Sequence, residues 1–321
     1  MRSVKSADSF HWRFVLAARN FSTSRGFGHL LAIITIIIWG TTYISTKVLL
    51  TGFEPTEILI IRFIMGFLIL FFLHPHILKP QGWKREILFA LAGLCGITLY
   101  YLLENIALVY TQASNVGVII CVAPFFTAFI ARAVWGKAAP LRLFFFLGFV
   151  LAMIGISLIS FTGTSVTFSL KGDLLALLAA IVWSFYSVIT KILSDADYPV
   201  IQITRRYFFY AIILMIPALI FLPFSPDFAL LKEPRYLLNI LFLGIVASAI
   251  CFITWNSSVK IIGAVTSSIY IYLTPVVTVI TAMIVLHEHL APSEWIGVVI
   301  TMIGLLLSEY RPKKHTPRLP E

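Results

Sequence analysis

Apolar residues dominate this chain between residues 29 and 310, where they fall into ten segments separated by short polar joints. A helix needs about 20 apolar residues to cross a bilayer, whereas the strands of a β-barrel would alternate in polarity and be about half as long. The pattern therefore predicts an all-α membrane protein with ten transmembrane helices. Their expected ranges are 30–50, 56–73, 87–109, 113–134, 142–161, 173–193, 199–222, 236–257, 264–286 and 293–309.

The second half of the chain repeats the first in a fixed register, which indicates two copies of one unit. At an offset of 144 residues the matched pairs include Trp39 and Trp183, Lys47 and Lys191, and Arg62 and Arg206. At offsets of 151 and then 149 they include Asn105 and Asn256, Pro124 and Pro275, and Gly148 and Gly297. Because each unit holds five helices, an odd number, the second copy must enter the membrane upside down, as in transporters with inverted repeats. The expected organisation is a basic tail (1–28), a first repeat (29–161), a linker loop (162–172), a second repeat (173–310) and a basic tail (311–321).

The composition requires a bilayer as the solvent for most of the chain. Of the 321 residues, 60% are hydrophobic and 12% are charged, and the mean hydropathy is +0.96. Soluble domains carry about 25% charged residues. The three cysteines lie in apolar segments, where we expect them to pack as small hydrophobic residues.

The net charge of +10 lies in the joints and tails, so it favours membrane topology over nucleic-acid binding. With the N-terminus inside, the inner segments hold 16 Lys and Arg residues and the outer loops hold three. This bias predicts that both termini are cytoplasmic. The segment over residues 1–28 is a basic cytoplasmic tail, an over-long start or a transit peptide. The first two are favoured because the first membrane helix already supplies an insertion signal.

Several short motifs carry a resemblance to a known family. They are Trp39-Gly40, Arg62-Phe63, the run from Ala113-Ser114-Asn115 to Pro124, and the closing set Glu288, Pro292, Gly297 and Gly304. In this order they resemble the drug/metabolite transporter superfamily, specifically its ten-helix EamA-type branch, over residues 29–310. The resemblance implies an exporter-like carrier with a central cavity lined mainly by helices one, three, four, six, eight and nine. It also implies that helices five and ten buttress the bundle from outside.

Hydroxyl and aromatic residues share one face of the first helix, and the sixth helix repeats this stripe. The stripes consist of Thr35, Trp39, Thr42, Tyr43 and Thr46, and of Trp183, Tyr186, Ser187 and Thr190. Such residues either wall a cavity or join helices by hydrogen bonds. Trp39 lies about 14 Å along its helix, near the bilayer midplane, which favours a cavity. The candidate substrate-binding residues are Trp39, Thr42, Tyr43, Tyr101, Glu104, Asn115, Trp183, Tyr186, Trp255, Asn256 and Tyr270.

Glu104 is the one acid placed well inside an apolar segment, and an intramembrane acid indicates a functional site. It either binds a substrate amine or carries a coupling proton, or else it is hydrated or paired with Lys47 at the outer mouth. Lys47 and Lys191 end their helices, where we expect their charge to complement the helix dipole.

Two further matched pairs have structural interpretations beside functional ones. Arg62 and Arg206 either bind a substrate carboxylate or, as we expect, tether the scaffold. Pro124 and Pro275 lie near the middle of helices four and nine, where proline removes a backbone hydrogen bond. They act either as hinges or as fixed kinks that shape a cavity.

The sequence offers no enzyme or metal chemistry. In His287-Glu288-His289 the two histidines point to opposite sides of a helix, so we expect no metal site. We find no phosphate-binding loop and no nucleophile with a placed base, so we expect no cofactor and no enzymatic activity.

The sequence thus predicts a secondary transporter, an exporter of small metabolites such as amino acids, in the bacterial inner membrane. A nucleotide-sugar or nucleotide carrier, a channel and an integral membrane enzyme are the alternatives. The expected partners are the substrate and the lipid bilayer, with a coupling proton as an open alternative and no nucleic acid. The chain is expected to be a monomer or a homodimer.

Overall fold

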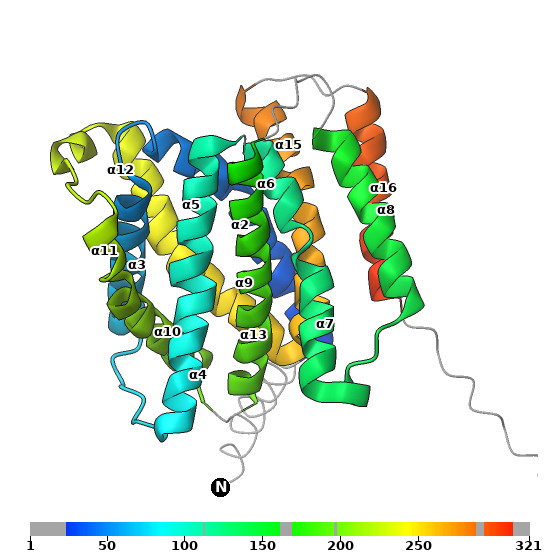
Figure 1. The fold of residues 1–321 in the computed structure, drawn as a ribbon, viewed down its shortest axis with the longest axis horizontal. Helices are drawn as coiled ribbons and strands as arrows, with labels where there is room; N and C mark the ends of the chain where they lie inside the picture. The colour runs from blue at the N-terminus through cyan, green and yellow to red at the C-terminus, as the bar shows by residue number, and fades with distance from the viewer. Residues whose placement is uncertain (1–23, 112, 161–168, 196–197, 287–291, 311–321) are drawn as a thin grey trace, which may run out of the picture.

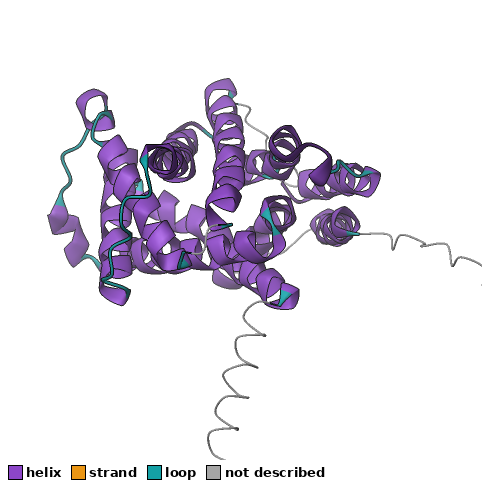
Figure 2. Ribbon diagram, turned by 90° about the horizontal axis from the view of Figure 1, so that it is seen from below, coloured by secondary structure: helices purple, strands orange, loops and turns teal. Residues whose placement is uncertain are grey.

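The computed structural model describes residues 24–111, 113–160, 169–195, 198–286 and 292–310 (Figure 1). Within these residues every regular element is a helix, and no strand occurs (Figure 2). Seven helices are long and apolar enough to cross a membrane, and three shorter apolar helices accompany them in the described part of the chain. The prediction of an all-α, ten-helix membrane protein is confirmed. The expected tails lie largely outside the described residues.

The first repeat supplies helices one to five. They are α2 (Arg25–Leu49), α3 (Pro55–Leu73), α4–η1–α5 (Trp83–Gly93, Leu94–Leu99, Tyr100–Tyr110), α6–α7 (Ala113–Ile120, Ala123–Trp135) and α8 (Leu143–Ser160), with the short turn η2 (Gly136–Ala138) after α7. Helix one begins five residues before its expected start at residue 30. It does so because the Ser24 side chain accepts a hydrogen bond from the Phe27 amide at 3.2 Å and caps the first turn.

The second repeat supplies helices six to ten. They are α9 (Leu170–Ser194), α10–α11 (Val200–Met215, Ala218–Phe221), α12–η4–α13 (Pro234–Leu241, Phe242–Ile250, Cys251–Ile262), α14–η5–α15 (Ala264–Ile269, Tyr270–Tyr272, Leu273–Leu286) and α16 (Pro292–Glu309), with η3 (Phe228–Lys232) before α12.

Irregular turns fall at matched places in the two repeats. The π-helical segments η1 and η4 lie in the middle of helices three and eight, and π-turns are frequent at functional sites. Helix four is interrupted between α6 and α7, and helix nine is interrupted by the 3₁₀ turn η5. The predicted kinks at Pro124 and Pro275 are therefore real interruptions, with each proline in the first turn of the helix that follows. Broken helices at membrane depth are tolerated where they line a cavity or are buried in protein.

The two repeats interlock around the centre of the bundle. The first helix of each repeat packs against the third and fourth helices of the other: α2 lies along α13 and α15, and α9 lies along α5 and α7. The second helix of each repeat packs on the third helix of the other: α10 lies against α4 and η1, and α3 lies against η4. The space enclosed by α2, α5 and α9 is therefore shared by both repeats.

Helices five and ten form a close pair on one flank of the bundle, where α8 and α16 run side by side (Figure 1). Glycines permit this approach. A Cβ atom on Gly155 would lie 2.5 Å from the Thr301 amide nitrogen, and one on Gly304 would lie 2.5 Å from the Ala152 amide nitrogen. Small residues at helix contacts are typical of membrane bundles, where close van der Waals packing replaces the hydrophobic effect.

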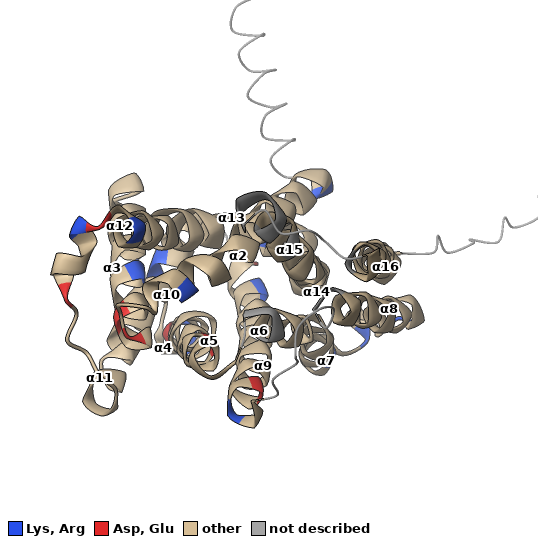
Figure 3. Ribbon diagram, turned by 90° about the horizontal axis from the view of Figure 1, so that it is seen from above, with Lys and Arg blue, Asp and Glu red and all other residues tan. Residues whose placement is uncertain are grey.

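The outer surface suits a bilayer. Large apolar side chains are exposed along it, among them Phe72, Leu170, Ile220 and Phe221. Viewed from above, most of the described ribbon carries neither acidic nor basic residues (Figure 3). In water this surface would be an extensive exposed apolar patch, whereas lipid tails cover it without cost.

Candidate functional site

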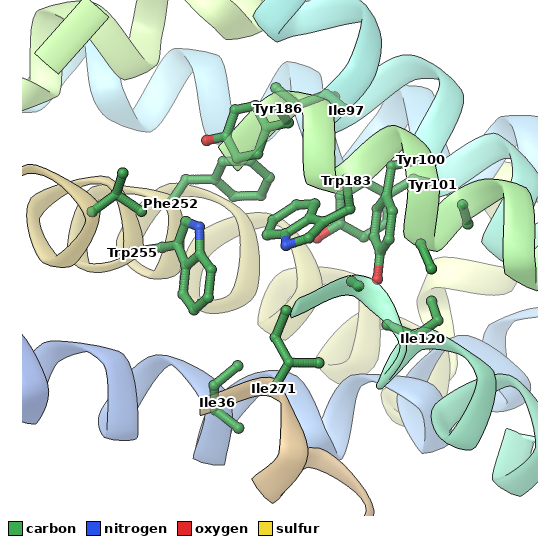
Figure 4. Packing of buried hydrophobic residues seen from close by; sticks show 14 of the residues in the cluster. Ile36, Ile97, Tyr100, Tyr101, Ile120, Trp183, Tyr186, Phe252, Trp255 and Ile271 are labelled. Carbon is green, nitrogen blue, oxygen red and sulfur yellow. The ribbon is translucent and has the colours of Figure 1, made fainter. Parts of the chain in front are cut away.

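A small cavity of about 30 Å³ lies at the centre of the interlocked repeats. It is walled by helices one, three, four, six and nine, and Figure 4 shows the packing of some of its side chains with their neighbours. The lining residues are Ile36, Trp39, Thr42, Tyr43, Tyr100, Tyr101, Glu104, Ile120, Trp183, Ile271 and Thr274. A water needs roughly 10–15 Å³ measured in this way, so the cavity has room for about two waters.

The matched tryptophans meet in this cavity. The Trp39 and Trp183 ring centroids lie 5.3 Å apart with the rings nearly perpendicular, an edge-to-face arrangement. The Trp39 indole donates to the Ala247 carbonyl at 2.9 Å, which fixes its orientation. The buried Trp183 indole nitrogen has no hydrogen-bond partner among the described residues. Trp183 therefore brings a free donor to the cavity, whereas Trp39 brings only its ring.

Glu104, which also lines the cavity, has a hydrogen-bond acceptor without a partner among the described residues. Its side chain is 5% exposed, and its Oε2 atom has no hydrogen-bond partner in the described part of the chain. Tyr100 interacts with Glu104 and with Tyr43, and its ring centroid lies 4.8 Å from that of Trp183. In the structure Lys47 does not pair with Glu104, because its Nζ donates to the Leu108 carbonyl at 2.6 Å instead.

Six of the predicted residues line the cavity: Trp39, Thr42, Tyr43, Tyr101, Glu104 and Trp183. Four others lie apart from it and have local partners or packing. The Tyr186 hydroxyl donates to the Asn256 side chain at 2.6 Å, and Asn256 donates to Thr204 at 2.9 Å, so these residues join helices six, seven and eight. Tyr270 hydrogen-bonds to His29 at 2.7 Å.

Trp255 is fully buried beside Trp39, with ring centroids 5.3 Å apart, and packs behind the cavity wall. The side chain of Asn115 and the segment His287-Glu288-His289 lie outside the described residues.

The polar stripes on helices one and six divide between the two predicted roles. Thr35, one turn before Trp39, shares a 2.6 Å hydrogen bond with Thr254 and so joins helices one and eight. Trp39 and Thr42 face the cavity. Ser187 bonds within its own helix, to the Trp183 carbonyl at 3.1 Å.

The sequence did not indicate the part of the cavity wall that forms where the interruptions of helices four and nine meet. The Cys121 thiol, at the break in helix four, lies 3.4 Å from the Ile271 carbonyl in the 3₁₀ turn of helix nine. Ile120 and Ile271 beside these breaks line the cavity. The matched prolines indicated broken helices, but no residue indicated that the two breaks touch. Tyr100 was also missed, although it precedes the predicted Tyr101.

The paired arginines have different surroundings. Arg206 forms a salt bridge with Glu86 at 2.8 Å, which fits a scaffold role at one end of the bundle. Arg62 is fully buried, donates to Ser248 at 3.1 Å, and lies over the Tyr101 ring at 4.3 Å from its centroid. Neither arginine lines the cavity.

A larger opening of about 370 Å³ lies toward the end of the bundle that holds Lys191. It is bordered by α7, α8, α9, α14 and α16, and its charged residues are Arg142, Lys191, Asp195 and Glu309. This volume is within the range of roughly 300–1,000 Å³ found for small-molecule pockets. The described residues contain no group of three His, Cys, Asp or Glu side chains that could hold a metal ion.

Two interlocked helical repeats around a polar, aromatic cavity define a membrane carrier, and comparison with known proteins identifies its family. The EamA-like transporter family matches residues 26–161 and again residues 170–310. An uncharacterized transporter of Archaeoglobus fulgidus is 30% identical over 87% of this chain and 96% of its own. A probable terminal-alkyne amino-acid exporter of Streptantibioticus cattleyicolor is 22% identical over 87% of this chain and 92% of its own.

A protein of known crystal structure matches the fold with a TM-score of 0.72 at 19% identity, covering 89% of this chain and 99% of that one. The chain belongs to the EamA-like transporter family and is a multi-pass membrane transporter.

Proposed function

We propose that this protein is a secondary transporter that exports a small polar or amphipathic metabolite, such as an amino acid or a related compound, across the bacterial inner membrane. Substrate would bind in the central cavity between the two repeats, and rocking of the repeats would expose the cavity to one side at a time.

The observation that carries the proposal is a small central cavity lined by Trp183 and Glu104, each of which has a buried polar atom without a hydrogen-bond partner among the described residues. Unpaired buried polar groups are costly, and they persist where function needs them. At about 30 Å³ the cavity is far too small for an amino acid, so binding requires a conformation in which the repeats have moved apart.

The difference between the two ends of the bundle supports alternating access. At the Lys47 end, Lys47 bridges to the end of helix three through the Leu108 and Thr111 carbonyls, at 2.6 and 3.3 Å. At the Lys191 end, the opening of about 370 Å³ lies between α7, α8, α9, α14 and α16. Hydrogen bonds thus join the helices at the Lys47 end, while an opening lies at the Lys191 end. An alternating-access carrier requires such a difference between its two ends.

The described lining contains no Lys or Arg, which disfavours a nucleotide or nucleotide sugar because phosphate groups need cationic partners. The similarity to a protein named as a probable amino-acid exporter supports an amino-acid-like substrate.

The test is metabolite profiling of medium and cells when the protein is overproduced, deleted, or replaced by Trp183→Ala. We expect one compound or one related group to accumulate in the medium on overproduction and in the cells on deletion. Uptake by vesicles containing purified protein would then confirm direct transport. Unchanged profiles in all strains, together with no flux of any tested metabolite in vesicles, would remove the proposal.

A further inference from the structure

The described lining of the cavity contains one acidic side chain and no Lys or Arg. Among the described lining residues only Glu104 carries a charge, and its free Oε2 atom is the unpartnered acceptor. Lys47, on the neighbouring helix, is occupied by the carbonyls of Leu108 and Thr111. A substrate that enters the cavity therefore meets a carboxyl group that forms no salt bridge within the described residues, although the charge of Arg62 acts on it.

The buried Arg62 lies outside the described lining, and its Nη2 atom has no hydrogen-bond partner among the described residues. Arg62 donates its Nε to Ser248 at 3.1 Å and stacks over the Tyr101 ring at 4.3 Å. Tyr101 lines the cavity and Arg62 does not. The described lining thus contains no Lys or Arg side chain to pair with a substrate carboxylate, and the buried indole nitrogen of Trp183 is a donor on it that lacks a partner among the described residues.

Aromatic rings surround the carboxylate. Tyr43, Tyr100, Tyr101, Trp39 and Trp183 all line the cavity with Glu104. The Tyr100 ring lies 4.8 Å from both the Tyr101 and the Trp183 rings, so these rings form a continuous wall. The faces of tyrosine and tryptophan rings attract cations and also accept apolar groups, whereas they give an anion nothing.

We propose that this cavity selects the protonated amine of an amphipathic organic cation, with Glu104 as its ion-pair partner and the surrounding rings as its walls. The proposal rests on the transport function above and narrows its substrate class. Amines related to amino acids but lacking a free carboxylate fit the cavity. A zwitterionic amino acid would place its carboxylate among the rings without a cation, and that desolvation is unfavourable.

The test compares three probes that share a phenyl ring and differ in charge: phenethylamine, phenylalanine and 3-phenylpropionate. Binding to the purified full-length protein in detergent at neutral pH is measured by ligand-induced thermal shift. We expect phenethylamine to bind at least about tenfold more tightly than phenylalanine, and 3-phenylpropionate not to bind, because a buried carboxylate pairs only with the cation.

Variants show whether Glu104 is responsible. Glu104→Gln keeps the size of the side chain and should weaken phenethylamine binding by about tenfold or more, while Glu104→Asp should retain part of it. Asp227→Asn removes an exposed acid outside the membrane core and should leave binding unchanged. Elution volume and ligand-free melting temperature establish that each variant is folded.

Equal or tighter binding of phenylalanine would overturn the inference, as would full phenethylamine affinity in folded Glu104→Gln, or no binding by any of the three probes. These outcomes leave the transport function standing if profiling still finds an exported compound. If phenethylamine binds through Glu104 but no compound crosses the membrane in cells or vesicles, the transport function fails and the amine site remains.

Discussion

Lys47 and Lys191 occupy equivalent positions in the two repeats, and each donates to a backbone carbonyl near the end of the third helix of its own repeat. Lys47 Nζ lies 2.6 Å from the Leu108 carbonyl and 3.3 Å from that of Thr111. Lys191 Nζ lies 3.4 Å from the Lys260 carbonyl and 2.6 Å from the Asp195 carboxylate. Because the repeats are inverted, the two lysines join helices at opposite ends of the bundle. The hydrogen bond to the carbonyl is short at Lys47 and long at Lys191. From the sequence we had expected only that the charge of each lysine would interact favourably with the dipole of its helix.

Replacing Lys47 by Met should loosen the end of the bundle that it fastens. Thr46→Cys, at a buried position beside it, reports this opening in a background without the native cysteines. Labelling by a membrane-impermeant thiol reagent should become about tenfold faster in Lys47→Met, because hydrogen bonds from a charged donor contribute roughly 1.5–3 kcal/mol. The matched Lys191→Met should leave the rate unchanged. Equal rates in both variants would mean that Lys47 does not hold this end closed.

The two cavity tryptophans should differ in their contribution to stability. Trp39→Phe removes the hydrogen bond to the Ala247 carbonyl and should cost about 1 kcal/mol, whereas Trp183→Phe removes no hydrogen bond within the described residues and should cost less. Both should raise the half-saturating substrate concentration, because both rings line the cavity. Thermal unfolding and vesicle transport separate the two effects. A larger loss of stability in Trp183→Phe would contradict this assignment.

The sequence predicted the ten helices and named Trp39 and Trp183 as matched candidates for one central cavity, because both follow from periodicity and repeat register. It could not assign each stripe residue to the cavity or to a helix contact. Helical spacing tells which face a residue occupies but not what the facing helix offers. Tyr186 lies one turn after Trp183, yet its hydroxyl donates a hydrogen bond to Asn256 on helix eight and does not line the cavity.

The contact between the interruptions of helices four and nine could not be predicted from the sequence either. Pro124 and Pro275 indicated where helices four and nine would be irregular. The contact between Cys121 and the Ile271 carbonyl is made by residues with no turn signal of their own. It arises because the inverted repeats place both breaks at the same depth, which is a property of the assembled bundle.

Gly155 should tolerate no side chain. A Cβ atom there would lie 2.5 Å from the Thr301 amide nitrogen and 2.6 Å from the Gly297 carbonyl, so backbone must move in Gly155→Ala. We expect a loss of about 1–3 kcal/mol in stability, measured by thermal unfolding in detergent. Gly26→Ala is the matched control, since no atom lies within 4 Å of its Cβ position. An unchanged melting temperature for Gly155→Ala would show that helices five and ten are not packed as closely as described.

Both termini should lie on the cytoplasmic side. His29, near the start of α2, lies 3.6 Å from Glu309 at the end of α16, so the first and last helices reach the same end of the bundle. The excess of basic residues in the tails and joints of that end predicts that it faces the cytoplasm.

Single cysteines placed within residues 1–23 and after Arg311 should therefore resist an impermeant thiol reagent in intact cells. A cysteine at Thr51, exposed at the opposite end, should react and serves as the positive control. Labelling of both tails with protection of position 51 would reverse the orientation, and labelling of one tail alone would contradict the ten-helix topology.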